Sequence, residues 1–392
     1  MFERDDGLSA LRPVYITGTG AFLPGEPIDN DAMEGVLGQV AGRTSALGRR
    51  VLRWNGIKTR HYALDTQGQP TQTNAGMCAQ AVRAAAEDAQ ISLGRLEHLA
   101  AATTQGDLLV PGHAAQVHAE LACGPLETAS FQSVCGSALM AAKSAWQAIR
   151  TEEADVATAC AGEQASRWFR PHFYEGTELV DAKGRLAMEA EYLRWTLSDG
   201  AGAIWLAPKP RETGVSMRID WIDIVSLADR FDPCMWAGAT VRDRHELKQA
   251  WPFLGPQAAF DAGAIALQQD FTLLKKIIRA WIGVYLQKVD EGRINPAAID
   301  HLLLHYSAQS LREEIVRLLS DTGAMIDEAL WFNTLAQTGN TGSASIWIML
   351  QALIRERAPQ PGQTVLAVVP ESGRGLVGFM HMTAVDAEGE GP

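Results

Sequence analysis

The stretch Ala129-Ser-Phe-Gln-Ser-Val-Cys-Gly-Ser-Ala-Leu-Met-Ala-Ala142 places a cysteine between a predicted strand and a predicted amphipathic helix. We predict the strand over 127–134 and the helix over 137–151, with Cys135 in the turn that joins them. A thiol at a helix N-terminus faces the positive end of the helix dipole and unpaired N–H groups, which favours the thiolate. Cys135 is therefore a candidate nucleophile for thioester exchange. A small cysteine that only fills the core is the alternative.

Strands and helices alternate on both sides of this turn. Strands are predicted at 14–17, 98–104 and 155–161, and 197–206 is interpreted as a glycine-rich turn that leads into a strand. Further strands are predicted at 214–227, 300–305, 330–333 and 364–369. Helices are predicted at 73–90, 111–122, 264–290, 309–320 and 343–357. This alternation predicts an α/β fold with mainly parallel sheets.

The length of 392 residues favours two domains. The best boundary is Pro208-Lys209-Pro210, which gives an N-terminal half of 1–208 and a C-terminal half of 209–392. An aromatic segment at 164–195 breaks the alternation and is interpreted as an insertion that lies over another part of the fold.

The net charge of −12 argues against binding of nucleic acid or an anionic membrane through bulk charge. Basic clusters at 49–60 and 275–279 are either solvated faces or local sites for anions. There is no apolar run of membrane-spanning length, no signal-peptide pattern and no CxxC pair among the five cysteines. We therefore expect a soluble cytoplasmic protein without a cysteine zinc site.

His305 stands at the C-terminal end of the predicted strand Asp300-His-Leu-Leu-Leu-His305. In α/β sheets this end of a strand is where ligands and catalytic groups gather. A structural histidine is the alternative. His301 and His305 have the spacing of a metal pair, but no third ligand lies nearby in the sequence, so we expect no metal.

Asn340 lies in the glycine-rich turn Thr338-Gly-Asn-Thr-Gly-Ser-Ala-Ser345, which leads into a predicted helix. Ordinary turn chemistry, with Thr341 or Ser343 as the helix cap, explains this turn. The functional interpretation is an amide N–H donor presented at the turn. Two other glycine pairs, at 18–20 and 200–202, are not followed by a helix and therefore do not predict a dinucleotide site.

Five motifs in the same order resemble the 3-oxoacyl-acyl-carrier-protein synthase III group of the thiolase superfamily. They are Ile16–Pro24, Asn55–Arg60, Cys135–Ser137, Ser198–Ala203 and Gly339–Thr341. The resemblance implies two similar α/β halves in a layered αβαβα arrangement and a homodimer.

The resemblance also implies roles for individual residues. Cys135 takes an acyl group from acyl-CoA or from an acyl carrier protein, with no further cofactor. His305 and Asn340 stabilise the enolate of a malonyl or 3-oxoacyl thioester, which attacks the acyl group in a Claisen condensation. The N–H groups of Cys135 and Gly373 form an oxyanion hole. Residues expected to contact substrate or pantetheine are Trp54, Arg60, Gly339 and Ser307.

The chain departs from the family pattern at several of these positions. Arg50 replaces the tryptophan that stacks on CoA, and Trp54 stands where the family has an arginine, which favours a carrier protein as donor. Tyr306-Ser307-Ala308 follows His305 where the family has Gln-Ala-Asn. Glu371 and Arg374 replace a glycine and a phenylalanine, so Glu371 is either a general base or a residue on the loop surface.

These departures suggest a specialised lipid or polyketide enzyme, with the ketosynthases that build cyclohexanedione or dialkylresorcinol rings as the nearest group. Two other functions stay open. Acyl transfer to an alcohol or amine needs no enolate and is disfavoured by Asn340. A non-catalytic subunit is disfavoured by the presence of Cys135 and His305.

Overall fold

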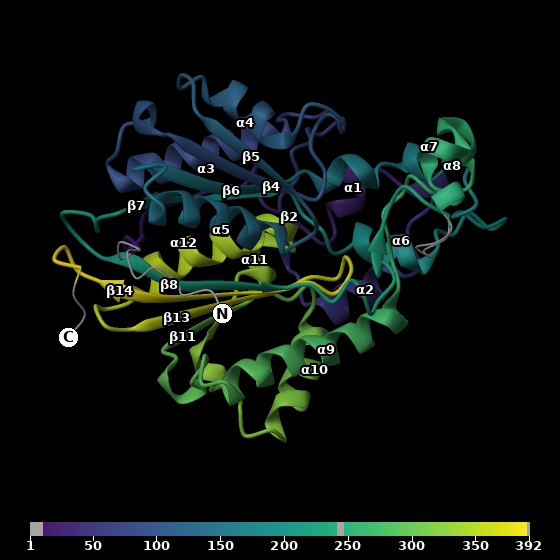
Figure 1. Cartoon of the computed structure of the whole chain (residues 1–392). Coiled ribbons are helices and arrows are strands. Elements are labelled where there is room, and N and C mark those ends of the chain that lie inside the picture. The colour runs from purple at the N-terminus through teal and green to yellow at the C-terminus, as the bar shows by residue number, and fades with distance from the viewer. Residues whose placement is uncertain (1–10, 241–246, 390–392) are drawn as a thin grey trace.

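A computed structural model describes residues 11–240 and 247–389, and it shows five layers of alternating helices and strands (Figure 1). Helices α3 (Asn74–Ala89) and α4 (His113–Leu121) form one outer layer, and α9 (Phe271–Asp290) and α10 (Gln309–Ser320) form the other. Helices α5 (Ser137–Arg150) and α12 (Ser345–Arg357) lie in the middle, between two layers of strands. The predicted layered α/β fold is confirmed.

The two strand layers have the same internal order. The first runs β5-β4-β6-β7-β1 and the second runs β12-β11-β13-β14-β8. Strands of the first layer are β1 (Tyr15–Phe22), β4 (His98–Thr103), β5 (Glu127–Gln132), β6 (Ala157–Glu163) and β7 (Gly200–Ala207). Strands of the second are β8 (Ser216–Val225), β11 (His301–Leu304), β12 (Trp331–Phe332), β13 (Thr364–Pro370) and β14 (Val377–Val385).

The two layers join where β1 pairs with β8, through Tyr15 with Arg218 and Ile16 with Met217. This short pairing makes one continuous ten-stranded sheet. The repeated strand order is consistent with the predicted halves 1–208 and 209–392, and that division stays a prediction.

The expectation of mainly parallel sheets is wrong. β4 pairs in parallel with β5 and β6, and β11 pairs in parallel with β12 and β13, but every pairing that involves β1, β7, β8 or β14 is antiparallel. β14 was not predicted, and it follows β13 after a loop at 371–376 that is too short for a helical crossover. The parallel pairs lie toward the two ends of the sheet, and the antiparallel pairs lie in its centre.

Two other element boundaries differ from the prediction. Helix α9 begins at Phe271 rather than at 264, because the Asp270 side chain accepts hydrogen bonds from the N–H groups of Thr272 and Leu273 and so caps the helix there. The glycines at 18 and 20 lie inside β1 rather than in a turn after it. A Cβ on Gly18 would lie 2.1 Å from the carbonyl oxygen of Ala85, so the absence of a side chain lets α3 pack directly on this strand.

Several of the shorter elements, among them α6, α7 and α8, lie at one side of the layers, whereas α11 lies near the middle, beside α12 (Figure 1). The short helices are α1 (Met33–Leu37), α2 (Gly48–Asn55), α6 (Met188–Arg194), α7 (Trp251–Leu254), α8 (Pro256–Asp261) and α11 (Leu335–Thr338). The short strands are β2 (Ile28–Asp29), β3 (Thr59–Arg60), β9 (Met235–Trp236) and β10 (Gln268–Gln269). Phe169 and Tyr174 of the aromatic segment are buried in a cluster that also includes Met33, Val51 and Tyr62.

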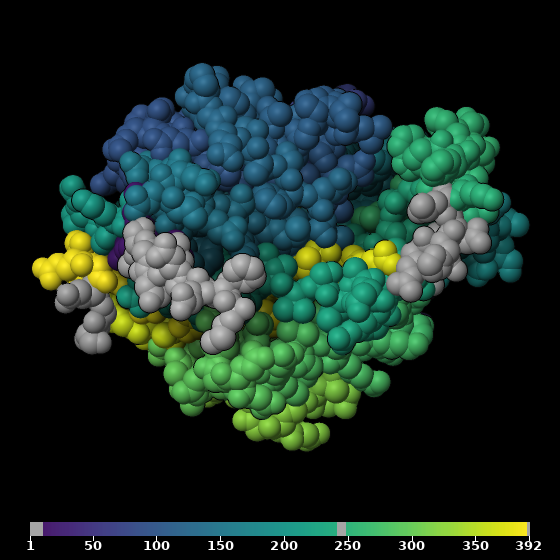
Figure 2. All heavy atoms as spheres, in the orientation of Figure 1, coloured from purple at the N-terminus to yellow at the C-terminus, as the bar shows by residue number. Residues whose placement is uncertain are grey.

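The surface view shows the same arrangement from outside (Figure 2). Residues of the first half cover the upper part, residues of α9 and α10 cover the lower part, and C-terminal residues reach the surface between them. In the parts of the chain that the structure describes, no helix combines the length and the apolar character needed to cross a membrane.

Candidate active site

Cys135, His305 and Asn340 line a single cavity, although they come from three distant segments. Cys135 follows β5, His305 follows β11, and Asn340 follows α11. Each therefore stands directly after a strand or helix that the core holds in place. Ser307 lines the same cavity, as do Tyr192 and Thr196 from the aromatic segment and the turn after it.

Cys135 is 6% exposed and lies two residues before the first residue of α5. Burial raises the pKa of its thiol well above the usual value, and the nearby carboxylates of Glu371 and Glu163 raise it further. This rise in pKa is opposite to the stabilised thiolate that the sequence led us to expect. Because the sulfur rests as a thiol, acyl transfer needs a group that takes its proton.

The imidazole of His305 is neutral and can therefore take the proton of a thiol. Burial lowers the pKa of its imidazole to about 4, so the ring is neutral at physiological pH. Its backbone N–H donates to the carbonyl oxygen of Val368 (3.0 Å), which ties the end of β11 to the neighbouring strand β13. A neutral imidazole in this cavity can accept a proton from a thiol or donate a hydrogen bond to a carbonyl oxygen.

Asn340 is oriented by the backbone of its own turn. Its Oδ1 accepts a hydrogen bond from the N–H of Gly342 (3.0 Å), and its backbone carbonyl accepts one from the N–H of Ser198 (2.8 Å). Within residues 11–240 and 247–389, its Nδ2 group has no hydrogen-bond partner, so this donor remains for a ligand. Oδ1 of Asn340 therefore stabilises the turn, and Nδ2 is the donor available to a ligand. The two interpretations from the sequence apply to different atoms of one side chain.

The predicted helix caps at this turn are not formed. The Ser343 hydroxyl donates to Glu163 (2.6 Å), and the Thr341 hydroxyl is hydrogen-bonded to that of Ser345 (2.9 Å). Both side chains are fully buried. They fix the Asn340 turn against the end of β6 instead of capping α12.

Glu371 is buried beside the nucleophile and is not a loop-surface residue. Its Oε2 accepts from the backbone N–H of Gly136 (3.0 Å), and its Oε1 accepts from the hydroxyl of Ser133 (2.7 Å). Burial raises the pKa of this carboxyl group, while hydrogen bonds to the Ser133–Gly136 segment oppose that rise. The carboxylate thus holds the turn that carries Cys135, and this geometry does not favour the general-base interpretation.

Gly373 lies against the same turn. A Cβ on it would lie 2.7 Å from Oε1 of Glu371 and 3.0 Å from Cγ2 of Val134, so no larger residue fits at this position without a shift. Its carbonyl oxygen accepts from the N–H of Cys234 (2.8 Å). The oxyanion role of its N–H stays a prediction.

Two of the residues expected to bind pantetheine have other positions. Arg60 is fully buried and donates to the carbonyl oxygen of Trp195 (2.7 Å), so it holds the segment before the cavity instead of contacting a substrate. Trp54 is 40% exposed on α2, with the guanidinium of Arg50 4.5 Å from the centre of its ring. It lies at the surface and does not line the cavity of Cys135.

Gly339 and Ser307, the other two residues expected to bind pantetheine, lie nearer to the cavity. Gly339 has φ +69°, and a Cβ there would lie 2.8 Å from that of Ser198 and 3.1 Å from that of Arg60. It is therefore a backbone requirement of the Asn340 turn. Ser307 lines the cavity of Cys135 together with Tyr192.

Several site residues were missed by the sequence analysis. Glu163 ends the buried strand β6 and accepts hydrogen bonds from the side chains of Thr104 (2.8 Å) and Ser343 (2.6 Å). The sequence signal that could have identified Glu163 is a carboxylate at the end of a buried strand. Ile278 and Trp281 of α9 also line the cavity, but their helical spacing looks the same as that of any core helix. The metal interpretation gains no support, because no cluster of three or more His, Cys, Asp or Glu side chains suited to a metal occurs in the described ranges.

A layered α/β fold whose cysteine, histidine and asparagine meet in one cavity defines a thiolase-fold enzyme of the acyl-transferring type. The C-terminal model of 3-oxoacyl-[acyl-carrier-protein] synthase III matches residues 289–379, which include His305 and Asn340. The chain is therefore similar to the 3-oxoacyl-acyl-carrier-protein synthase III enzymes, which are acyl-transferring condensing enzymes.

Curated relatives match the chain over nearly its whole length. A β-ketoacyl-[acyl-carrier-protein] synthase III of Rhodospirillum rubrum is 24% identical over 352 residues, covering 90% of this chain and 93% of its own. The acetoacetyl-CoA synthase NphT7 of a Streptomyces species is 26% identical over 359 residues, with the same coverage of 90% and 93%.

Solved structures share the fold at lower identity. The tetronic acid condensing enzyme AbyA1 has a TM-score of 0.73 at 19% identity and covers 94% of this chain and 99% of its own. OleA of Xanthomonas campestris has a TM-score of 0.71 at 17% identity, covering 95% and 99%.

Proposed function

We propose that this protein catalyses a Claisen condensation between an acyl group held on Cys135 and the enolate of a second thioester. The observation that carries the proposal is the meeting of Cys135, His305 and Asn340 in one cavity. In the first half-reaction, the neutral imidazole of His305 takes the thiol proton and the sulfur attacks the thioester carbonyl. The donor thiol leaves with that proton, and an acyl-cysteine remains.

In the second half-reaction, a malonyl thioester loses CO₂ and becomes an enolate. The N–H of His305 and the Nδ2 group of Asn340 donate hydrogen bonds to its oxygen. The enolate carbon attacks the acyl carbonyl and forms the new carbon–carbon bond. The Cys135 sulfur leaves as a thiolate and is reprotonated, and a 3-oxoacyl thioester is released.

A malonyl donor fits better than a 3-oxoacyl donor. Decarboxylation generates the enolate without a base, whereas a 3-oxoacyl thioester must be deprotonated. Glu371 is the carboxylate that the sequence suggested for this step, but both its oxygens are hydrogen-bonded to the Cys135 turn. The role in specialised lipid or polyketide synthesis, including alkylresorcinol-type rings, remains a proposal that rests on the departures from the family motifs.

Acyl-CoA and acyl carrier protein are the partners that this chemistry requires, because both present acyl groups on a phosphopantetheine thiol. Two exposed basic clusters support an anionic partner, in a protein whose net charge is −12. Arg49, Arg50 and Arg53 lie on α2, and Lys275, Lys276 and Arg279 lie on α9. Helix α10 packs against both of these helices.

A homodimer and a cytoplasmic location complete the proposal. Strand β5 is the last strand at its end of the sheet and is largely exposed, so a second copy can extend the sheet there. The apolar side chains of Leu108, Leu109 and Val110 are also exposed, at 58%, 74% and 80%. Light scattering of the purified protein tests the dimer.

The experiment for the reaction itself is intact-protein mass spectrometry with a panel of acyl-CoA and acyl-carrier-protein donors, followed by product analysis with malonyl and 3-oxoacyl acceptors. We expect a mass gain that is absent from Cys135→Ala, and then a carbon–carbon product. A C–O or C–N product would establish the alternative, acyl transfer to an alcohol or amine.

A further inference from the structure

The cavity of Cys135 carries hydroxyl groups that are not needed for proton transfer or for binding the enolate oxygen. Those of Tyr192, Thr196 and Ser307 are among them. Within residues 11–240 and 247–389, no lysine, arginine, aspartate or glutamate belongs to the lining of this cavity. A negatively charged group of a substrate must therefore be bound there by neutral hydrogen-bond donors.

A malonyl thioester brings such a group, because its carboxylate carbon is only two bonds from the thioester carbonyl carbon. If His305 and Asn340 hold the carbonyl oxygen, the carboxylate has to lie close to them. Besides burial, the carboxylates of Glu371 and Glu163 raise the pKa of Cys135, so another negative charge is disfavoured next to the sulfur. The malonyl carboxylate thus needs a hydrogen-bond donor that stands near His305 and Asn340 but not against the sulfur.

The hydroxyl of Tyr192 meets this requirement. Tyr192 is 5% exposed, and burial raises its pKa, while the side chains of Ser307 and Thr196 oppose that rise. The hydroxyl therefore keeps its proton at physiological pH and can donate it in a hydrogen bond. Ser307 follows His305 by two residues, and the carbonyl oxygen of Thr196 accepts from the N–H of Asn340 (3.3 Å). The Tyr192 hydroxyl thus lies among side chains that flank both residues of the enolate site.

The ring of Tyr192 is held by packing. It meets the ring of Phe271 edge to face, with the ring centres 4.8 Å apart and the planes at 81°. Phe271 is the first residue of α9, and the Asp270 side chain fixes that end of the helix by accepting from the N–H groups of Thr272 and Leu273. Removal of the hydroxyl alone therefore leaves the ring and its main contact in place.

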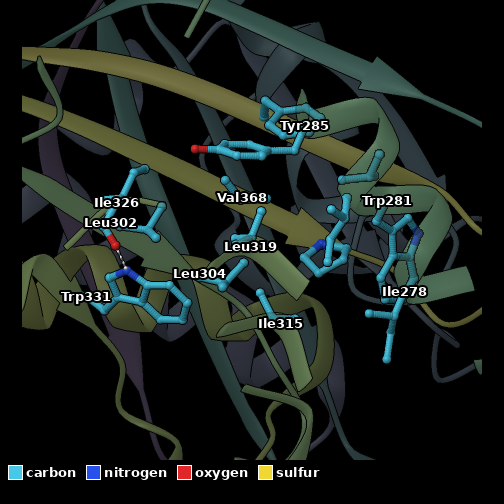
Figure 3. A pocket seen from close by; sticks show the side chains of 14 residues that line it. Ile278, Trp281, Tyr285, Leu302, Leu304, Ile315, Leu319, Ile326, Trp331 and Val368 are labelled. Atoms are coloured by element: carbon cyan, nitrogen blue, oxygen red, sulfur yellow. Dashed lines mark hydrogen bonds between the residues drawn. The ribbon is translucent and has the colours of Figure 1, made fainter. Parts of the chain in front are cut away.

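The other donors in the lining are less suited to a carboxylate. The amide of Gln269 and the hydroxyl of Ser372 donate to the sulfurs of Cys234 (3.6 Å) and Met235 (3.5 Å). The buried indole N–H of Trp281 has no hydrogen-bond partner within the described residues. Trp281 also borders a neighbouring cavity whose lining is apolar and aromatic throughout (Figure 3). A carboxylate placed there would exchange its hydration for carbon surface, which is costly.

We propose that the hydroxyl of Tyr192 binds the carboxylate of the malonyl thioester and makes the enzyme selective for a carboxylated second substrate. This inference rests on the proposed condensation and assigns a specificity-determining residue to it. In the decarboxylation, the bond between C2 and the carboxylate carbon breaks, its electron pair forms the enolate, and neutral CO₂ leaves. Tyr192 keeps its proton throughout, so its hydrogen bond acts on the bound malonyl group and weakens as the charge moves to the enolate.

Tyr192→Phe tests this hydrogen bond in steady-state condensation with a fixed acyl-CoA donor and varied malonyl-CoA. We expect the KM for malonyl-CoA to rise about tenfold or more, because a hydrogen bond to a charged group is lost. The kcat should be unchanged or higher, since the interaction is not strengthened in the transition state. A lower kcat at an unchanged KM would overturn the proposal.

Tyr306→Phe is the matched control, because Tyr306 lines the same cavity and the substitution removes the same group. We expect the KM of this variant for malonyl-CoA to equal that of wild type. If Tyr306→Phe raises the KM as much as Tyr192→Phe does, or if it alone raises the KM, the inference is wrong. Thermal unfolding of both variants reports whether they are folded.

Binding to Cys135→Ala separates this inference from the proposed reaction, because no acyl-enzyme can form. In isothermal titration we expect malonyl-CoA to bind about tenfold or more tightly than acetyl-CoA, and the added Tyr192→Phe substitution to abolish this preference. Both results in a protein that shows no condensing activity would keep the assignment of Tyr192 and remove the reaction. Condensation with equal KM values for malonyl-CoA in wild type and Tyr192→Phe, or only with 3-oxoacyl thioesters, would keep the reaction and remove the assignment.

Discussion

The carboxylate of Glu371 accepts a hydrogen bond from the backbone N–H of Gly136 at 3.0 Å, next to the nucleophile and from a segment 235 residues further along the chain. The second carboxylate oxygen takes the hydroxyl of Ser133, two residues before Cys135. The Glu371 side chain therefore accepts hydrogen bonds from a residue before Cys135 and from the residue after it. It also places a negative charge near the sulfur, which raises the pKa of Cys135.

Glu371→Gln should make Cys135 more reactive at rest. The substitution removes the charge, so the pKa of the thiol falls and its thiolate fraction at pH 7 rises. We expect roughly three- to tenfold faster alkylation by iodoacetamide at pH 7, with the midpoint of the pH profile moved to lower pH. Peptide mass spectrometry reports the modification at Cys135 alone.

Glu163→Gln is the matched control for this measurement. Glu163 also raises the pKa of Cys135, but less than Glu371 does, and it holds Ser343 and Thr104 instead of the nucleophile turn. Glu163→Gln should therefore also speed the alkylation of Cys135, but by less than Glu371→Gln does. Equal profiles for wild type and Glu371→Gln would show that the carboxylate does not influence the sulfur.

Asn340→Ala should separate the two half-reactions. The Nδ2 donor serves the enolate, so condensation should fall by about 10²- to 10³-fold, whereas acylation of Cys135 should change little. The Ala side chain also loses the bond from Gly342, so Asn340→Asp, which keeps an oxygen at that position, is the paired variant. Parallel assays of acyl-enzyme mass and of malonyl-dependent product provide the readout, and an equal loss in both assays would contradict the assignment.

The sequence could single out Cys135 and His305, which line one cavity in the structure, because each stands just beyond an element with a clear pattern. Cys135 precedes an amphipathic helix, and His305 ends an apolar strand. In a layered α/β fold such positions meet at the ends of the strands, so local signals and their order are sufficient. The resemblance to a known family then added Asn340, which lies in a turn of ordinary composition.

The surroundings of these residues could not be predicted in the same way, because they depend on packing between distant segments. Arg60 belongs to a family motif, yet its burial against Trp195 follows from how the aromatic segment folds. Glu371 was visible as an unusual residue, but its role depends on a contact with Gly136. The raised pKa of Cys135 could not be predicted for the same reason, since it comes from burial and from the carboxylates of Glu371 and Glu163.

The neutral state of His305 has a kinetic consequence. Because burial lowers the pKa of its imidazole to about 4, the ring remains able to accept the thiol proton throughout mildly acidic conditions. The acylation rate should therefore show no loss centred near pH 6.5, the ordinary value for histidine. Single-turnover acylation between pH 5 and 8 provides the measurement, with circular dichroism to confirm that the protein is folded. A midpoint near 6.5 would mean that His305 is protonated in the working enzyme.

The last prediction concerns acid stability and uses His113, which lies outside the reaction centre. Burial lowers the pKa of its imidazole to about 4, and its Nε2 lies 3.5 Å from the sulfur of Cys78. Between pH 6.5 and 4 the unfolded chain binds a proton on this histidine while the native protein does not. The free energy of unfolding should therefore fall as the pH is lowered through this window, by up to about 3 kcal/mol from His113 alone.

His113→Gln removes this proton-binding group from both states. Its free energy of unfolding at pH 7 should be lower than that of wild type, because a buried side chain is altered, but it should decline less steeply toward pH 4. Urea unfolding at several pH values measures the two slopes. His118→Gln, on the same helix but at a partly exposed position, controls for loss of a histidine as such. If His113→Gln and wild type lose the same free energy of unfolding between pH 6.5 and 4, then His113 is protonated in the native protein, and its buried position does not keep it neutral.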